Sequence, residues 1–189
     1  LDGTTSYAAG YNGNANSSLS LDTNTSRILL SPAPSLSGGN WTVAFWFYNL
    51  KPNSDWRTGL RGFNSDHQII VENGSNRLGV YANGNGNFRE SGFEMPSADY
   101  QGWHHIVAVG SGTTTAFYVD GVSVGSSDRK STDNIYAVGN GSWSGANQIF
   151  SDRIDEFAVW SRALSASEVA EIHNRQIDPG LGYVGSVPY

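Results

Sequence analysis

Two acidic side chains in this sequence stand where a hard cation could bind them, and Asp155 is the first. It alternates with Phe157 and Val159 in a strand-like run, so its carboxylate is expected to face an apolar interior. Burying a carboxylate without a partner costs several kcal/mol, so Asp155 needs backbone N–H groups or a cation. Ca²⁺ takes about six to eight oxygen ligands, and segment 1–16, with Asp2, could supply others. Amide capping and calcium binding both stay open.

Asp66 is the second acidic candidate, because it ends a polar loop and directly precedes a strand-like run. Carbonyl oxygens of nearby amides could complete a calcium site there, with open positions for the carboxylate or hydroxyl groups of a ligand. The candidate donors are Asn64, Asn73, Asn140, Asn147 and Gln148. The alternative is that these residues only stabilise ordinary turns. His67 and Gln68 follow Asp66 and are expected to contact the same ligand.

Large aromatic side chains also occur in polar loops, at Trp56 and Trp143. Each could stack on a sugar ring or a tyrosine of the ligand, or could fold back as a lid over the core. Arg57, Arg61 and Arg89 could clamp a carboxylate, although most exposed arginines are simply solvated. The predicted ligand-binding residues are Asp66, His67, Gln68, Trp56, Arg61, Asn140, Trp143 and Gln148, and the predicted metal ligands are Asp155, Asp66, Asn140 and Asp2.

Composition limits the partners of these residues. The 189 residues carry 11 Lys and Arg against 17 Asp and Glu, a net charge of −6, and no basic stripe, which argues against nucleic acid. No apolar stretch approaches the roughly 20 residues of a membrane span, so no membrane insertion is expected. The absence of Cys excludes thiol catalysis and disulfides. Because the sequence begins at Leu1 without a signal-like segment, we expect a piece of a longer protein with neighbouring domains.

The scaffold that must position these residues is a set of short strands separated by Gly, Ser and Asn turns. Ser165 and Glu168 have capping-box spacing, which predicts one short helix ending near His173. Glu90 and Glu94 are expected to lie in a loop-like stretch, and segment 180–189 is expected to be a linker or tail. The expected strands are 18–22, 41–48, 68–71, 78–81, 103–109, 114–119, 122–124, 135–138 and 154–160.

Four segments in this order resemble the concanavalin A-like, laminin-G-like jelly-roll family. They are Gly102–Val109 (GWHHIVAV), Ala116–Gly121 (AFYVDG), Arg153–Trp160 (RIDEFAVW) and Ala163–Glu168 (ALSASE), and the resemblance covers about residues 10–175. It implies an all-β antiparallel jelly-roll sandwich with one short C-terminal helix. It also implies a ligand-binding domain, which we place at residues 1–178, with 179–189 as a linker or tail. In related jelly rolls the Asp of the Ile-Asp-Glu motif, here Asp155, often holds a structural calcium ion.

A narrower resemblance runs through 66–71 (DHQIIV), 135–140 (IYAVGN) and 147–150 (NQIF). These segments are similar to domains near the ends of large calcium-dependent bacterial surface adhesins. The resemblance implies an extracellular, calcium-dependent adhesion module that recognises a peptide or glycan on another cell surface. The alternative is a carbohydrate-binding module attached to a polysaccharide-degrading enzyme.

An enzymatic role finds little support in the residues. A glycosidase needs two carboxylates facing each other across the bond, whereas Glu72 stands alone at a turn. His104 and His105 are adjacent in a strand, so their side chains face opposite sides and are predicted to be structural. A polysaccharide lyase would need a Tyr, such as Tyr81 or Tyr118, beside one of the histidines. We expect a binding domain rather than an enzyme.

Overall fold

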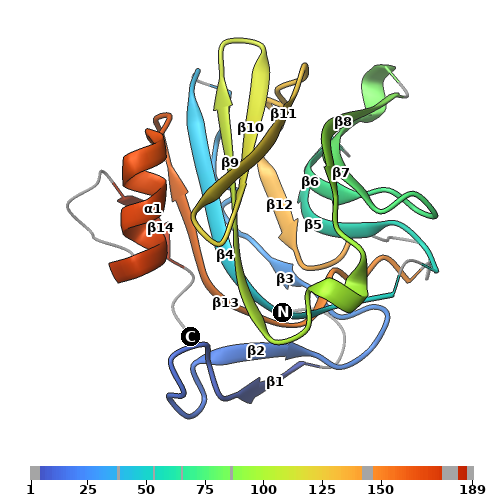
Figure 1. The fold of residues 1–189 in the computed structure, drawn as a ribbon, viewed down its shortest axis with the longest axis vertical. Coiled ribbons are helices and arrows are strands. Elements are labelled where there is room, and N and C mark those ends of the chain that lie inside the picture. The colour runs from blue at the N-terminus through green and yellow to red at the C-terminus, as the bar shows by residue number, and fades with distance from the viewer. Residues whose placement is uncertain are drawn as a thin grey trace.

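The computed structural model describes residues 5–37, 39–52, 54–64, 66–85, 87–141, 147–175 and 183–186, which form a sandwich of two β-sheets with one α-helix on the outside (Figure 1). The strands are β1 (Thr5–Ala8), β2 (Ser18–Leu21), β3 (Ile28–Leu29), β4 (Trp41–Leu50), β5 (Arg57–Gly62), β6 (His67–Val71), β7 (Arg77–Ala82), β8 (Asn87–Glu94), β9 (Trp103–Ser111), β10 (Thr114–Val119), β11 (Val122–Ser127), β12 (Ile135–Val138), β13 (Ser151–Trp160) and β14 (Tyr183–Ser186). The helices are the 3₁₀ turns η1 (Asn83–Asn85) and η2 (Ser97–Asp99), and α1 (Ala166–Arg175).

Both sheets are antiparallel, which confirms the predicted jelly-roll sandwich. In the described part of the chain, the eight-stranded sheet has the order β1-β2-β13-β4-β9-β10-β11, with β14 also paired to β13. The six-stranded sheet has the order β3-β12-β5-β6-β7-β8. The two hairpins expected on either side of 72–77 and 111–114 form as β6–β7 and β9–β10. Among the described residues, no helix has both the length and the apolar character needed to cross a membrane.

The main hydrophobic core lies between the sheets. It is built from alternate residues of each strand, because successive side chains of a strand point to opposite faces. Fully buried members include Phe45, Phe47, Leu60, Ile69, Val80, Ile106 and Phe117. Strand β4 is apolar on both faces and lies between β13 and β9, the central place that its sequence predicts.

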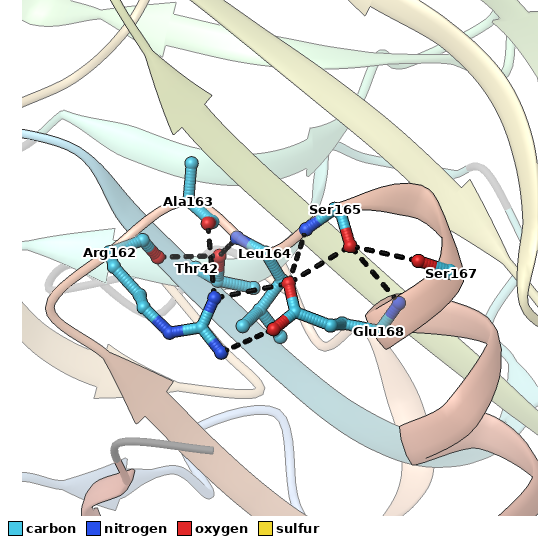
Figure 2. A network of polar contacts seen from close by, with 7 residues as sticks. All are labelled: Thr42, Arg162, Ala163, Leu164, Ser165, Ser167 and Glu168. Atoms are coloured by element: carbon cyan, nitrogen blue, oxygen red, sulfur yellow. Dashed lines mark hydrogen bonds and ion pairs between the residues drawn. The ribbon is translucent and has the colours of Figure 1, made fainter.

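Helix α1 covers the outer face of the eight-stranded sheet, where a second apolar cluster includes Trp160, Val169 and Ile172. Figure 2 shows how the helix begins. The Ser165 N–H donates to Glu168 Oε2 at 2.8 Å, and the Glu168 N–H donates back to Ser165 Oγ at 3.3 Å. The carboxylate of Glu168 also accepts hydrogen bonds from both terminal nitrogens of Arg162. The predicted capping box is therefore confirmed.

Five strands lie outside the strands that the sequence predicts, namely β1, β3, β5, β8 and β14. Strands β5 and β8 cross segments with few apolar residues, and β14 adds to β13 within the expected tail. Strand β8 ends its sheet and is largely exposed, so it needs no continuous apolar face. The sequence of β8 therefore shows little alternation of apolar and polar residues, although β8 pairs with β7 from one end to the other.

The last strands of the two sheets, β8 and β11, come into contact with each other. Gly125 of β11 has a φ of +133°, and a Cβ atom there would lie 2.3 Å from the carbonyl oxygen of Ser91 on β8. Only glycine allows both the backbone angle and this close approach. An ion pair joins Arg89 to Asp128 beside this contact, at 3.8 Å.

Candidate functional site

The outer face of the six-stranded sheet carries a cavity of about 210 Å³, which we call the aromatic pocket. The residues that line it are Trp56, His67, Ile70, Tyr81, Asn83 and Gln148. On β7, Leu78 and Val80 are core residues, so Tyr81 projects from the opposite face of the sheet. The pocket therefore opens away from the core. Figure 1 shows that strands β6 and β7 lie on the side of the sandwich opposite α1.

The aromatic rings of Trp56 and Tyr81 line this pocket, and the ring of Phe88 supports Trp56. The ring of Trp56 lies edge-on to Tyr81, with centroids 5.5 Å apart, and to Phe88, with centroids 5.4 Å apart. The Phe88 ring occupies the space over Gly79, where a Cβ atom would approach it to 2.8 Å. Trp56 thus packs against the outer face of the sheet and is half-buried, rather than closing over the core.

His67 forms the floor of the pocket and is 8 % exposed. Its ring stands edge-on to Tyr81, with centroids 5.9 Å apart. Burial lowers the pKa of His67 to about 3, and the positive charge of Arg61 adds to this effect. The imidazole is therefore neutral at ordinary pH. Its Nδ1 atom is buried and has no hydrogen-bond partner among the described residues.

The polar side of the pocket is held by neighbouring strands and turns. Gln148 accepts a hydrogen bond from Thr58 Oγ1 on its side-chain oxygen, at 3.2 Å, and another from the Thr58 N–H on its carbonyl, at 2.9 Å. Turn η1 is held by Asp66, because the Asn83 N–H donates to Asp66 Oδ1 at 2.9 Å. The amide groups of Gln148 and Asn83 are therefore presented by anchored segments.

A larger cavity, of about 680 Å³, lies on the other side of η1, and we call it the acidic pocket. Its lining includes Asp66, Asp133 and the exposed ring of Phe63. Both carboxylates serve as acceptors for loops. Asp66 accepts from Ser131 Oγ at 2.9 Å as well as from turn η1, and Asp133 accepts from the Asn64 N–H at 2.6 Å. These bonds fasten the loops before β6 and β12 to each other.

The other predicted ligand residues lie outside these cavities or outside the described residues. Arg61 donates to the carbonyl of Gly141, Gln68 is buried and donates to the Asp133 carbonyl at 2.8 Å, and Asn140 is buried and donates to the Asn24 carbonyl at 2.8 Å. None of these three is among the described residues that line either pocket. Trp143 and Asp2 fall outside the described residues. The structure therefore brings together Trp56, His67 and Gln148, with Asp66 on the neighbouring cavity.

Asp155 is buried, 1 % exposed, as the sequence predicts, but it faces the opposite side of its strand. It pairs with Trp46, whose ring lies on the outer face of the sheet under α1. The prediction that Asp155 and Phe157 share a face is wrong, because the strand has a bulge between them. In this bulge Glu156 takes a left-handed φ of +49°. One residue is thereby inserted, and the side chains after it change face.

Amide hydrogen bonds explain the burial of Asp155. The Tyr11 N–H donates to Asp155 Oδ2 at 3.1 Å, and the Glu156 N–H donates to Oδ1 at 2.9 Å. Tyr11 belongs to the N-terminal segment that was expected to cross this strand, and its ring stacks on Trp46 at 4.3 Å. Among the described residues, no three His, Cys, Asp or Glu side chains form a group suited to a metal ion. Calcium binding at Asp155, Asp66 and Asn140 stays a prediction.

Several polar residues at these cavities were not singled out by the sequence, among them Asn83 and Asp133. Asn83 lies in a run of Asn and Gly residues that gives no positional signal. Asp133 had a signal, because it precedes β12 by two residues much as Asp66 precedes β6 directly. Tyr81 was considered only as a partner for a lyase histidine.

The sequence and the fold are both similar to known proteins. The family model Laminin_G_3, described as the concanavalin A-like lectin/glucanases superfamily, matches residues 22–170. A comparison with curated proteins gave no match. Domain 4 of AbnA, an extracellular arabinanase from Geobacillus stearothermophilus solved with arabinotriose, shares 20% identity at a TM-score of 0.64, covering 90% of this chain and 82% of that one.

Two further solved structures have the same architecture. A putative carbohydrate-binding protein from Bacteroides ovatus has a TM-score of 0.61 at 15% identity, covering 84% of this chain and 46% of that one. A pentraxin from Limulus polyphemus has a TM-score of 0.52 at 18% identity, covering 89% and 80%. At these identities the structures establish a shared fold. Together with the family match, they place this chain in the concanavalin A-like lectin/glucanase superfamily.

Proposed function

We propose that this domain is a non-catalytic module that binds glycans, and that the aromatic pocket holds one sugar ring. The observation that carries the proposal is the composition of the pocket, in which Trp56 and Tyr81 stand beside the uncharged polar side chains of His67, Asn83 and Gln148. A sugar ring presents apolar C–H faces and a rim of hydroxyl groups, so its binding requires both kinds of surface. A cavity of about 210 Å³ suits a single ring better than a chain lying flat.

The comparisons support a carbohydrate as the ligand class. One neighbour was solved with arabinotriose, and another is a putative carbohydrate-binding protein. We extend the proposal to a role outside the cell, in adhesion to a glycan on another surface, as one domain of a longer protein. A module of a polysaccharide-degrading enzyme would use the same pocket on a different glycan, and a peptide is the alternative ligand.

The side chains at the site also support binding without catalysis. A lyase would use His67 as the base beside Tyr81, but a general base works best with a pKa near the operating pH. Burial lowers the pKa of His67 to about 3, which makes it a weak base. The carboxylates of Asp66 and Asp133 accept hydrogen bonds from loop groups, which favours a structural use over acid–base chemistry.

The test is binding of the purified domain to a glycan array and a peptide array, each with calcium and with excess chelator. We expect glycan binding that the Trp56→Ala variant weakens by about tenfold to hundredfold, on the order of 1–3 kcal/mol. Trp103→Ala is the matched control, because Trp103 is also half-buried against a tyrosine but belongs to the eight-stranded sheet. That variant should bind like the wild type. Loss of binding in chelator would support the predicted calcium dependence.

Other outcomes would replace the proposal. Binding to peptides alone would favour the peptide alternative. The release of unsaturated sugar ends from a uronate polymer would make the domain a lyase. Equal losses in Trp56→Ala and Trp103→Ala would place the binding site elsewhere.

A further inference from the structure

His67 combines two features that the packing of the fold does not explain. Its ring lines the aromatic pocket, and its Nδ1 atom is buried without a hydrogen-bond partner among the described residues. Most buried polar atoms in proteins have a partner. The other ring nitrogen, Nε2, is not among the buried unpaired atoms of the described residues, so it is the nitrogen that His67 presents to the pocket. The edge-on contact with Tyr81, at 5.9 Å between centroids, fixes the plane of the ring.

The protonation state of His67 follows from its surroundings. The ring is neutral, because burial and the charge of Arg61 both lower its pKa. A neutral imidazole has a proton on one nitrogen and a lone pair on the other. A buried N–H without an acceptor costs about 1–3 kcal/mol, whereas an unpaired acceptor is tolerated more often in protein interiors. The proton therefore belongs on Nε2, and Nδ1 holds the lone pair.

We propose that His67 is a specificity-determining residue that, as its Nε2–H tautomer, donates a hydrogen bond to an acceptor oxygen of an uncharged sugar ring in the aromatic pocket. This inference rests on the proposed function and names the ligand chemistry of the same site. The described lining residues include no carboxylate to bind an ammonium group, and the nearby positive charge of Arg61 disfavours an amino sugar.

A fixed donor selects ligands more strongly than the aromatic wall does. Stacking on Trp56 accepts any ring with an apolar face, so it discriminates weakly between sugars. A site that donates a hydrogen bond rejects an analogue without the matching oxygen, because the ligand then covers the donor and leaves it unpaired. His67 should therefore decide which hydroxyl pattern is bound.

The first experiment is nitrogen-15 NMR of the histidine-labelled domain, since the shifts of the two ring nitrogens report which one is protonated. We expect His67 to be the Nε2–H tautomer from pH 5 to 8, and its Nε2 signal to move on titration with the neutral glycan that binds best on the array. A protonated ring at pH 7, an Nδ1–H tautomer, or an Nε2 signal that glycan does not move would overturn the inference.

Variants supply the second test. His67→Gln keeps a side-chain N–H donor, and we expect its glycan affinity to stay within a few-fold of the wild type. His67→Phe fills the space without a donor, and we expect a loss of about tenfold, measured by calorimetry after a thermal melt has confirmed folding. His104→Phe, on the other sheet, is the control and should bind normally.

The outcomes separate this inference from the proposed function. If glycan binding is sensitive to Trp56→Ala but His67→Phe binds like the wild type, His67 does not determine specificity and the function stands. If the wild type prefers a glucosamine or a uronate over neutral sugars, the ligand class is wrong. If the wild type binds no glycan, both proposals fail.

Discussion

The two outer faces of the sandwich each contain a buried histidine, of which one lines a cavity and the other lies under a helix. Burial lowers the pKa of both His105 and His67 to about 3. His105 lies against Trp46 and under His173 of α1, with ring centroids 5.0 and 5.6 Å away. His67 lies at the floor of the aromatic pocket. A buried imidazole therefore does not mark a binding site by itself. Only an imidazole that lines a cavity is available to a ligand.

The cover over the eight-stranded sheet consists of α1 and the N-terminal segment. Val169 and Ile172 of α1 are fully buried, and Tyr11 stacks on Trp46 at 4.3 Å. We infer that one face contributes stability and the other binds the ligand. The predictions below test this division.

The largest effect is expected from Trp160→Ala on the covered face. Trp160 is fully buried between the sheet and α1, so its removal should destabilise the domain by about 3–5 kcal/mol, measured by denaturant unfolding. Trp56→Ala on the open face should change stability far less while it weakens glycan binding. Similar destabilisation by both variants would contradict the division between the faces.

Acid should destabilise the domain through both histidines. Their pKa values in the folded state lie near 3, below the ordinary value of about 6.5, so the unfolded chain takes up protons first. The stability that they contribute is fully present above about pH 6.5 and is lost as the pH falls towards 3. Each histidine should lower the free energy of unfolding by roughly 2 kcal/mol as the pH falls from 7 to 5.

His105→Phe tests the covered half of this prediction. The charged or titratable groups that act on His105 are His173, which lowers its pKa, and Asp120, which raises it. The variant should reduce the slope of stability against pH by about half, followed by unfolding in urea at several pH values. An unchanged slope in His105→Phe would show that the ring is not kept neutral.

Asp155→Ala should destabilise the domain by about 1–3 kcal/mol, because the N–H groups of Tyr11 and Glu156 lose their acceptor. A melt of the wild type in excess chelator separates the two roles of this carboxylate. A lower melting temperature in chelator, absent in Asp155→Ala, would place a calcium ion here. An unchanged curve would leave amide capping as its full role.

The smallest effect is expected at the start of α1. Ser165→Ala removes the oxygen that accepts the Glu168 N–H and should cost about 1 kcal/mol in thermal or urea unfolding. Exposed Ser161 provides a matched control. A loss in Ser161→Ala equal to that in Ser165→Ala would show that the cap adds nothing. Neither variant should alter binding in the aromatic pocket, on the opposite face.

Much of the fold follows from local signals in the sequence. Strand β4 is a long run of aromatic and other apolar residues, the turn at Asn73 and Gly74 favours a hairpin, and Ser165 with Glu168 predicts the start of α1. Each signal arises from residues close together in the chain, and therefore it is visible in one sequence. Trp56, His67 and Gln148 come to one pocket from three separate segments, and their residue types together with the family resemblance suggested this.

The remaining differences have physical causes outside the local sequence. The bulge at Glu156 changes the face of every later side chain in β13, although glutamate has no particular preference for a left-handed angle. Strand β8 is held by its pairing with β7 rather than by an apolar face. Asp133 and Asp66 line the same cavity because β12 and β6 both pair with β5. The sequence alone does not give this strand order.

The contact between Gly125 and Ser91 also bears on the solubility of the domain. A terminal strand with free N–H and C=O groups is a template on which a second molecule can add its own strand, and such additions begin aggregation. Here the ends of the two sheets press against each other, with the charges of Arg89 and Asp128 beside them. At this contact, a strand from another molecule could pair with β8 or β11 only after these two strands had separated. The contact between β8 and β11 therefore opposes edge-to-edge pairing of two copies of the domain at these strands.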